Sequence, residues 1–246
     1  IGKYVSLTDW KIANIVIDED YDEGIVDIIK EALDIIMNNK DLFIQRNSEA
    51  FEYLVYALCL SGISMQIVGS SRPASGAEHH ISHLLGSSDK KSGLYTDVLH
   101  GESVGVGTLI LTKFYHKLSQ IEDVSKYYLG YKVLTKEYLN KNFYELSDEV
   151  YKENKDDVIL SIDFKKFFAK WADIRKILSE MPSYEELYQY CSKLGLKKSL
   201  IEIGIKKDKE DTIIKLAPYI RNRLTLSRIM LAFDIDKIRI AKLAIN

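Results

Sequence analysis

The fold class is decided by the stretch DEGIVDIIKEALDIIM at residues 22–37. Its apolar residues recur at three- and four-residue steps, while Asp, Glu and Lys occupy the opposite side. This spacing is typical of an amphipathic α-helix that lies on the surface of a protein. The apolar stripe consists of Ile25, Ile28, Ile29, Ala32, Ile35 and Ile36.

The same periodicity continues along the chain, and no segment alternates as a half-buried strand would. The most apolar of the predicted helices, 48–68, carries little charge and is expected to be central. There is no internal repeat, flexible linker or low-complexity block. The sequence therefore predicts one all-α domain, a helical bundle over residues 1–246. Its further helices are expected over 102–120, 164–179 and 210–232.

Two local signals predict where helices begin. Ser183 and Glu186, and likewise Ser75 and Glu78, have the spacing of a capping box, in which a Ser and a Glu satisfy the free N–H groups of a first turn. A separate signal lies within 102–120, where Gly105 and Gly107 each cost about 1 kcal/mol relative to Ala. We expect these glycines to serve close packing or a ligand.

Composition narrows the function classes. The chain has 34 Lys plus Arg against 36 Asp plus Glu, a formal charge of −2, so nucleic acid is a poor default partner. The 46% hydrophobic content is that of a folded protein, and charged residues are expected to interrupt every candidate membrane span. Two cysteines, Cys59 and Cys191, make no disulfide framework, which predicts a cytoplasmic location. No GxGxxG or Walker loop occurs.

Four of the five histidines lie in GSSRPASGAEHHISH (69–83) and LHGE (99–102). On a helix that begins near residue 76, His79 and His83 share a face, and His80 points away from both. Two imidazoles at this spacing can bind a cation, or they can be ordinary structural histidines. His100 starts another helix, which could bring a further imidazole opposite the first two.

A possible anion site precedes the same helix. Ser70, Ser71, Arg72 and Ser75 lie where free backbone N–H groups and the helix dipole favour a negative charge. The alternative is that the serines only cap the helix and that Arg72 is solvated. The role of Glu102 also has two interpretations. It could orient a histidine, or it could be an acidic residue favoured in a first helical turn.

These residues carry a resemblance to a known family. SRPASGAEH (71–79) with Ser82 and His83, HGE (100–102) and VGVG (104–107) resemble the sn-glycerol-1-phosphate dehydrogenases. That family belongs to the superfamily of iron-type alcohol dehydrogenases, glycerol dehydrogenase and 3-dehydroquinate synthase. GKY (2–4), TDWK (8–11) and YIRNRLT (219–225) resemble it as well, so the likeness spans nearly the whole chain and is weakest from about 123 to 160.

The resemblance implies an N-terminal α/β domain that binds NAD or NADP and a C-terminal helical domain that holds a divalent metal, zinc or another such as nickel. This chain matches only the second, so we expect it to be a fragment. His79 and His100 are then metal ligands, and His83 is the catalytic residue that relays a proton. The family's third ligand, an Asp, would fall before Ile1. Asp9 is a disfavoured substitute.

The implied activity is NAD(P)-dependent interconversion of dihydroxyacetone phosphate and glycerol 1-phosphate, a phospholipid precursor. Arg72 and Ser75 are our candidates for binding the substrate phosphate. Two alternatives remain: a dehydrogenase for an uncharged polyol such as glycerol, and a non-catalytic helical interaction module. Expected partners are the substrate and the nucleotide-binding domain, with a homo-oligomer left open; the isolated chain is expected to be inactive.

Overall fold

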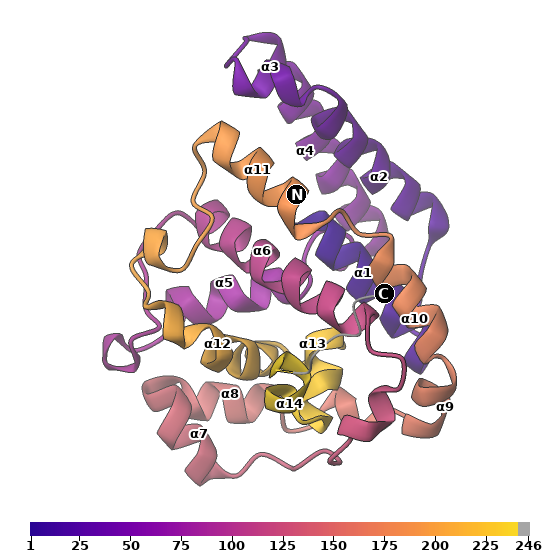
Figure 1. Cartoon of the computed structure of the whole chain (residues 1–246), viewed down its shortest axis with the longest axis vertical. Coiled ribbons are helices and arrows are strands. Elements are labelled where there is room, and N and C mark those ends of the chain that lie inside the picture. The colour runs from indigo at the N-terminus through magenta and orange to yellow at the C-terminus, as the bar shows by residue number, and fades with distance from the viewer. Residues whose placement is uncertain (241–246) are drawn as a thin grey trace.

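The computed structural model describes residues 1–240, and within them it contains fourteen α-helices and no β-strand (Figure 1). An isolated antiparallel bridge joins Tyr128 and Phe233. The predicted all-α class is confirmed. The helices are α1 (Lys3–Ile17), α2 (Glu23–Asn38), α3 (Lys40–Ile44), α4 (Glu49–Val68), α5 (Ala77–Ser87), α6 (His100–Ser119), α7 (Lys136–Phe143), α8 (Ser147–Glu153), α9 (Phe164–Ala169), α10 (Trp171–Ser179), α11 (Tyr184–Leu194), α12 (Glu210–Leu216), α13 (Leu226–Ile229) and α14 (Ile235–Ile240).

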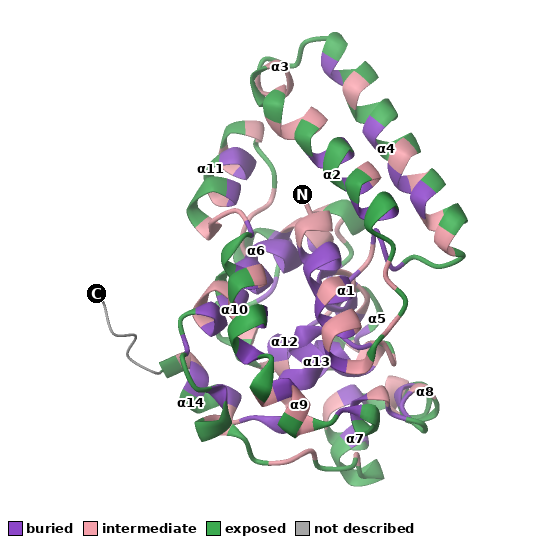
Figure 2. Ribbon diagram, turned by 90° about the vertical axis from the view of Figure 1, so that its right-hand side faces the viewer, coloured by how far each residue is buried: buried purple, intermediate pink, exposed green. Residues whose placement is uncertain are grey.

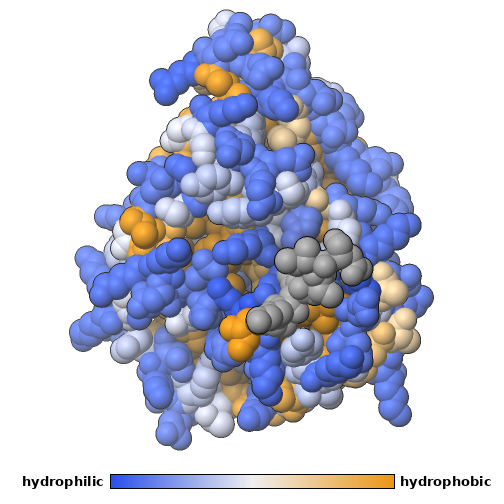
Figure 3. Space-filling model, in the orientation of Figure 1, coloured by the Kyte–Doolittle hydropathy of each residue, from blue (hydrophilic) through white to orange (hydrophobic). Residues whose placement is uncertain are grey.

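The centre of the molecule is built on α1, α5 and α6. α5 packs along α6, and both contribute to the main hydrophobic core together with α1, α10, α12 and α13. Leu85 and Leu118 are completely buried there, as is Ile12 of α1. On the surface drawn in Figure 3, hydrophilic residues predominate and hydrophobic ones are scattered among them. The core therefore fixes α5 and α6, the two helices that carry the histidines.

The helix α4 is not central, so that prediction was wrong. Figure 2 shows α4 along the outer edge of the molecule, where it packs on α2. It buries only the small residues Ala50, Ala57, Ser61 and Ser64. Its large side chains face outward, with Phe51 68% exposed and Ile67 60% exposed. Because α4 is apolar on all sides, its composition does not reveal which side packs.

The expectation that charged residues interrupt every candidate span was also wrong. No charged residue occurs between Tyr53 and Val68. Within residues 1–240, the single helix long and apolar enough to cross a membrane is α4, and 17% of its apolar window is buried. Length and composition alone do not make it a membrane span.

Two predicted helices are interrupted. The 164–179 helix divides at Lys170 into α9 and α10, and the 210–232 helix divides at Ala217–Ile220 into α12, a short 3₁₀ turn and α13. Pro218 explains the second break, because proline has no N–H group to donate within a helix. The later segment 221–225 runs without helix, and its Arg223 side chain donates to Ser71 and Ser75 in the loop before α5.

The capping box at Ser183 is confirmed: Ser183 Oγ accepts from the Glu186 N–H at 3.2 Å, and the Glu186 carboxylate accepts from the Ser183 N–H at 2.9 Å. The one expected at Ser75 is only half present. Glu78 Oε1 accepts from the Gly76 N–H at 2.8 Å. The N-cap residue is Gly76 and not Ser75, however, so no side chain caps the first turn of α5 in return. A Cβ at Gly76 would lie 2.8 Å from Ser6 Cα, so the close approach of α1 requires glycine there.

Gly107 permits the close packing of α6 on α5, and its replacement is a test of that contact. A Cβ at residue 107 would lie 3.0 Å from the Glu78 carbonyl oxygen and 3.2 Å from Ile81 Cβ. We expect Gly107→Ala to lower the free energy of unfolding by about 1–3 kcal/mol, the usual cost of overpacking. Urea denaturation measures it.

Gly105 supplies the matched control on the same helix. No atom lies within 4 Å of a Cβ placed there. Gly105→Ala should therefore stabilise the protein by up to about 1 kcal/mol through helix propensity. Equal effects of the two substitutions would contradict the packing role of Gly107.

Candidate active site

Three of the imidazoles meet where α5 faces the start of α6. His79 and His83 are on α5, and the ring of His100 lies 5.3 Å from that of His79 and 5.7 Å from that of His83, between centroids. His100 is exposed, and the other two are half-buried. The shared face expected for His79 and His83 thus forms, and α6 brings the third ring opposite it.

Each of the two histidines expected to bind metal is oriented by a second group. His79 Nδ1 lies 2.6 Å from Glu78 Oε1, and His100 Nδ1 lies 3.0 Å from Ser82 Oγ. Ser82 Oγ is in turn 2.7 Å from Ser103 Oγ. Such contacts to Nδ1 fix the rings and leave Nε2 free to bind a metal ion, and most metal-bound histidines have a partner of this kind on their other nitrogen.

The electrostatic environment favours the neutral imidazole. Burial lowers the pKa of His83, and the positive charge of Arg221 lowers it further. Burial also lowers the pKa of His100, with a smaller contribution from His79. Neutral imidazole is the form that binds divalent metals.

The donor set fits part of a metal site. Two oriented nitrogens from His79 and His100 suit zinc and similar divalent ions. Within residues 1–240, however, no group of three or more His, Cys, Asp or Glu side chains is arranged to hold a metal ion. The described residues would therefore supply at most two ligands here, and a complete site would need a further one.

Asp9 does not supply that further ligand, because its carboxylate is buried and both of its oxygens already accept hydrogen bonds from other parts of the chain. Its Oδ2 accepts from the Ala77 N–H at 2.9 Å, and its Oδ1 accepts from the Leu226 N–H at 2.9 Å and the Tyr115 hydroxyl at 2.7 Å. Glu102 acts as a cap, because its Oε2 accepts from the Leu99 N–H at 3.2 Å. That contact favours the second alternative for Glu102, an acidic residue of a first helical turn, over the orientation of a histidine.

Arg72 is committed to an ion pair. Its Nε and Nη2 donate to the two carboxylate oxygens of Glu19 at 2.6 and 2.7 Å, and Nη2 also donates to the Leu224 carbonyl oxygen. The side chain is only 4% exposed. It does not line the polar cavity next to His83. A role for Arg72 in binding substrate remains a prediction that this geometry does not favour.

That polar cavity contains residues that sequence reasoning missed. It has a volume of about 360 Å³ and lies between the start of α5 and the segment 221–223. Ser75, which was expected to bind substrate, lines it together with His83. The YIRNRLT segment carries a family resemblance, but nothing in the sequence indicates that its arginines line a cavity with the start of α5. The remaining lining residues are Ser71, His80, Glu153, Arg221, Asn222 and Arg223.

On the other side of the imidazoles is a second, more apolar cavity of about 300 Å³. His79 and His100 line it, together with Leu54 and Leu58 of α4 and with Ile36 of α2. The imidazoles therefore lie between an arginine-lined cavity and an apolar one. A small molecule with one charged and one uncharged end matches this polarity.

Comparison with known proteins confirms the family resemblance. No protein-family model matches the chain. A glycerol-1-phosphate dehydrogenase (NAD(P)+) from Halalkalibacterium halodurans is 37% identical over 115 residues, 47% of this chain and 29% of the relative. One from Methanococcus maripaludis is 40% identical over 126 residues, 50% of this chain and 36% of the relative.

The longest of these matches extends over most of the chain. A glycerol-1-phosphate dehydrogenase (NAD(P)+) from Geobacillus stearothermophilus is 28% identical over 233 residues, 92% of this chain and 50% of the relative. The chain thus spans about half the length of the curated relatives it matches. The likeness concerns a helical part of those enzymes.

Proposed function

Because the chain is related to glycerol-1-phosphate dehydrogenases, we propose that residues 1–246 form the metal-binding catalytic domain of an enzyme that interconverts dihydroxyacetone phosphate and glycerol 1-phosphate. The observation that carries the proposal is the convergence of three imidazoles from α5 and α6, two of them oriented through Nδ1. NAD or NADP would bind mainly to the α/β domain that the resemblance implies. The reaction supplies a phospholipid precursor, in a cytoplasmic setting.

His79 and His100 are the residues that would hold the metal. A zinc or similar ion supplies Lewis-acid polarisation of the substrate oxygen when it is bound. Glu78 and Ser82 keep the two rings in place, so their Nε2 atoms are held without loss of side-chain freedom on binding. The role that we assign to this pair is binding and orientation.

We assign to His83 the exchange of a proton with the substrate. It adjoins His100 on one side and the polar cavity on the other. A histidine that is neutral at physiological pH can donate or accept a proton at the oxygen that changes between carbonyl and hydroxyl. On the other side of His79 and His100, the apolar cavity lined by Leu54 and Leu58 would contact the uncharged part of the substrate.

A zinc titration by calorimetry tests the proposal. We expect the chain to bind one zinc ion and His100→Ala to lose that binding. The control is His116→Ala, which removes the histidine that bonds to the Pro182 carbonyl oxygen away from the site, and it should bind like the unchanged chain. If His100→Ala binds zinc as well as the unchanged chain does, the assignment of this ligand is overturned.

Substrate choice is tested on the protein in its full natural length. NAD(P)H oxidation should depend on dihydroxyacetone phosphate and should be lost in His83→Ala. Reduction or oxidation of glycerol-type polyols in preference to the phosphorylated substrate would favour a polyol dehydrogenase. An inactive protein that also binds no metal would favour a non-catalytic interaction module.

A further inference from the structure

A further cavity lies between α6, α11 and the segment that follows α11. It shares no lining residue with either of the cavities beside the imidazoles. Figure 1 shows α11 beside α6, and the two helices are in contact. The cavity has a volume of about 270 Å³, close to the lower end of the range for small-molecule pockets, about 300–1,000 Å³.

The interior of this cavity is apolar. Leu109 of α6 and Leu200 line it and are 1% and 4% exposed. Tyr184 and Tyr188 of α11 form another wall, and their rings lie 5.6 Å apart at an interplanar angle of 35°. These surfaces favour a ligand with a hydrocarbon or aromatic body, because its apolar area would leave water on binding.

The charges around the cavity are mainly positive. The carboxylate among the lining residues is that of Glu210, whose Oε1 already accepts from Arg239 Nη2 at 2.8 Å. Lys198 donates to Glu202 at 2.8 Å, which leaves two of the lysines without a carboxylate partner. This surplus favours an anion. The lysines that line the cavity are Lys113, Lys198 and Lys207.

Several donors at the cavity have no acceptor. Among the described residues, no hydrogen bond or ion pair is made by the ammonium groups of Lys113 and Lys207 or by the hydroxyls of Tyr184 and Tyr188. Burial raises the pKa of Tyr184, so its hydroxyl keeps its proton and can donate. Two ammonium groups and two hydroxyls are therefore available to one acceptor group on a ligand.

We propose that this cavity is a second ligand site, which binds a small organic anion with an apolar body. Lys113 and Lys207 hold the anionic group, and the body lies against Leu109 and Leu200. The site goes beyond the proposed dehydrogenase function, because it uses none of the imidazoles. Leu109 is nine residues after His100 on α6, about 14 Å along the helix axis, so the two sites are separate places on one helix.

The probe is 4-phenylbutanoate, added to the chain and followed by calorimetry and by NMR chemical shifts. We expect saturable binding, with shifts at Leu109 and Leu200. Lys113→Gln and Lys207→Gln should each weaken it about two- to fivefold, the range for an exposed charge pair. The alcohol 4-phenylbutan-1-ol has the same body without the charge, and it should bind at least about fivefold more weakly.

The matched control is Lys165→Gln, which removes an exposed charge of α9, outside the cavity. It should change the affinity less than about 1.5-fold. Equal weakening in Lys165→Gln and Lys113→Gln, equal binding of the alcohol and the carboxylate, or no saturable binding overturns the site. Binding that depends on Lys113 and Lys207 supports it whether or not zinc binds at His79 and His100. Circular dichroism checks that each variant is folded.

Discussion

Replacing Arg228 with Ala should lower the free energy of unfolding by about 3–5 kcal/mol, the usual cost of leaving one member of a buried ion pair alone. The Arg228 side chain is completely buried, and its Nη2 lies 2.8 Å from Asp157 Oδ1, itself 5% exposed. Nη1 donates to the carbonyl oxygens of Pro218 and Arg221. The substitution would therefore leave the Asp157 carboxylate without its positive partner and two buried carbonyl oxygens without a donor.

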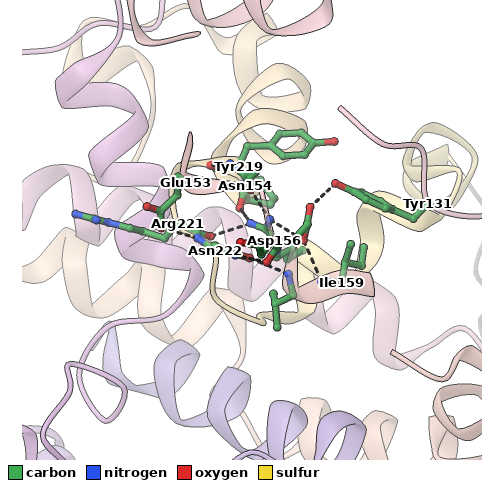
Figure 4. Close-up of polar contacts among 12 residues, drawn as sticks. Tyr131, Glu153, Asn154, Asp156, Ile159, Tyr219, Arg221 and Asn222 are labelled. Atoms are coloured by element: carbon green, nitrogen blue, oxygen red, sulfur yellow. Dashed lines mark hydrogen bonds and ion pairs between the residues drawn. The ribbon is translucent and has the colours of Figure 1, made fainter. Parts of the chain in front are cut away.

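Figure 4 shows the network around this pair. Asp157 also accepts from the Tyr131 hydroxyl and from the Ile159 N–H, and Arg228 binds Asn154, whose amide donates to the Tyr219 carbonyl oxygen. These bonds tie the segment between α8 and α9 to residues 218–221. Loss of Arg228 should accordingly loosen residues 218–221, which lead into the polar cavity beside His83.

Urea unfolding measures the effect, and an exposed ion pair is the control. Lys215 and Asp236 are 2.6 Å apart but 36% and 66% exposed, so Lys215→Ala should cost less than about 1 kcal/mol. A double variant, Arg228→Met with Asp157→Leu, should recover part of the loss because it strands no charge. A loss below about 1 kcal/mol for Arg228→Ala would contradict the account.

Helical class and the pairing of the histidines could be predicted because they follow from local spacing. The i, i+4 relation of His79 and His83 is a property of any helix, and the apolar stripe of 22–37 reappears as the buried Ile25, Ile29 and Ala32 of α2. The position of α4 could not be predicted. Which side of α4 is buried depends on where α2 packs against its small residues. Because α4 is apolar all round, its sequence has no apolar stripe that would indicate that side.

The hydrogen-bond partners of the arginines could not be predicted from the sequence either. Arg72 and Arg223 are both near the start of α5 in space, but one meets Glu19 and the other meets Ser71 and Ser75. These contacts join residues 53 to 152 positions apart, a range that no local pattern encodes. The sequence therefore points to Arg72, the arginine nearest to the histidines along the chain, whereas the arginines that line the cavity beside His83 are Arg221 and Arg223.

The second large effect is expected at Asp9, which joins α1 to three other parts of the core. Asp9→Ala should lower the free energy of unfolding by about 3–5 kcal/mol, because it leaves the N–H groups of Ala77 and Leu226 and the hydroxyl of Tyr115 without an acceptor. Thermal and urea unfolding measure the loss. A cost near that of an exposed aspartate would contradict this role.

Asp9→Asn separates charge from shape. Burial raises the pKa of Asp9 from 3.8 to about 6, although the hydrogen bonds from Ala77, Leu226 and Tyr115 oppose the shift. A group with a raised folded-state pKa contributes stability that is fully present below its unfolded pKa and is lost as the pH rises through its folded pKa. Asn carries no such titration and resembles the protonated acid.

The free energy of unfolding of the unchanged chain should therefore fall relative to that of Asp9→Asn between pH 4 and pH 7.5. Two pKa units correspond to about 3 kcal/mol, which sets the expected size of the difference. Urea unfolding of both proteins at a series of pH values measures it. Parallel pH profiles would mean that the three donors hold the carboxylate charged over the whole range, and that their attraction outweighs the cost of burying it.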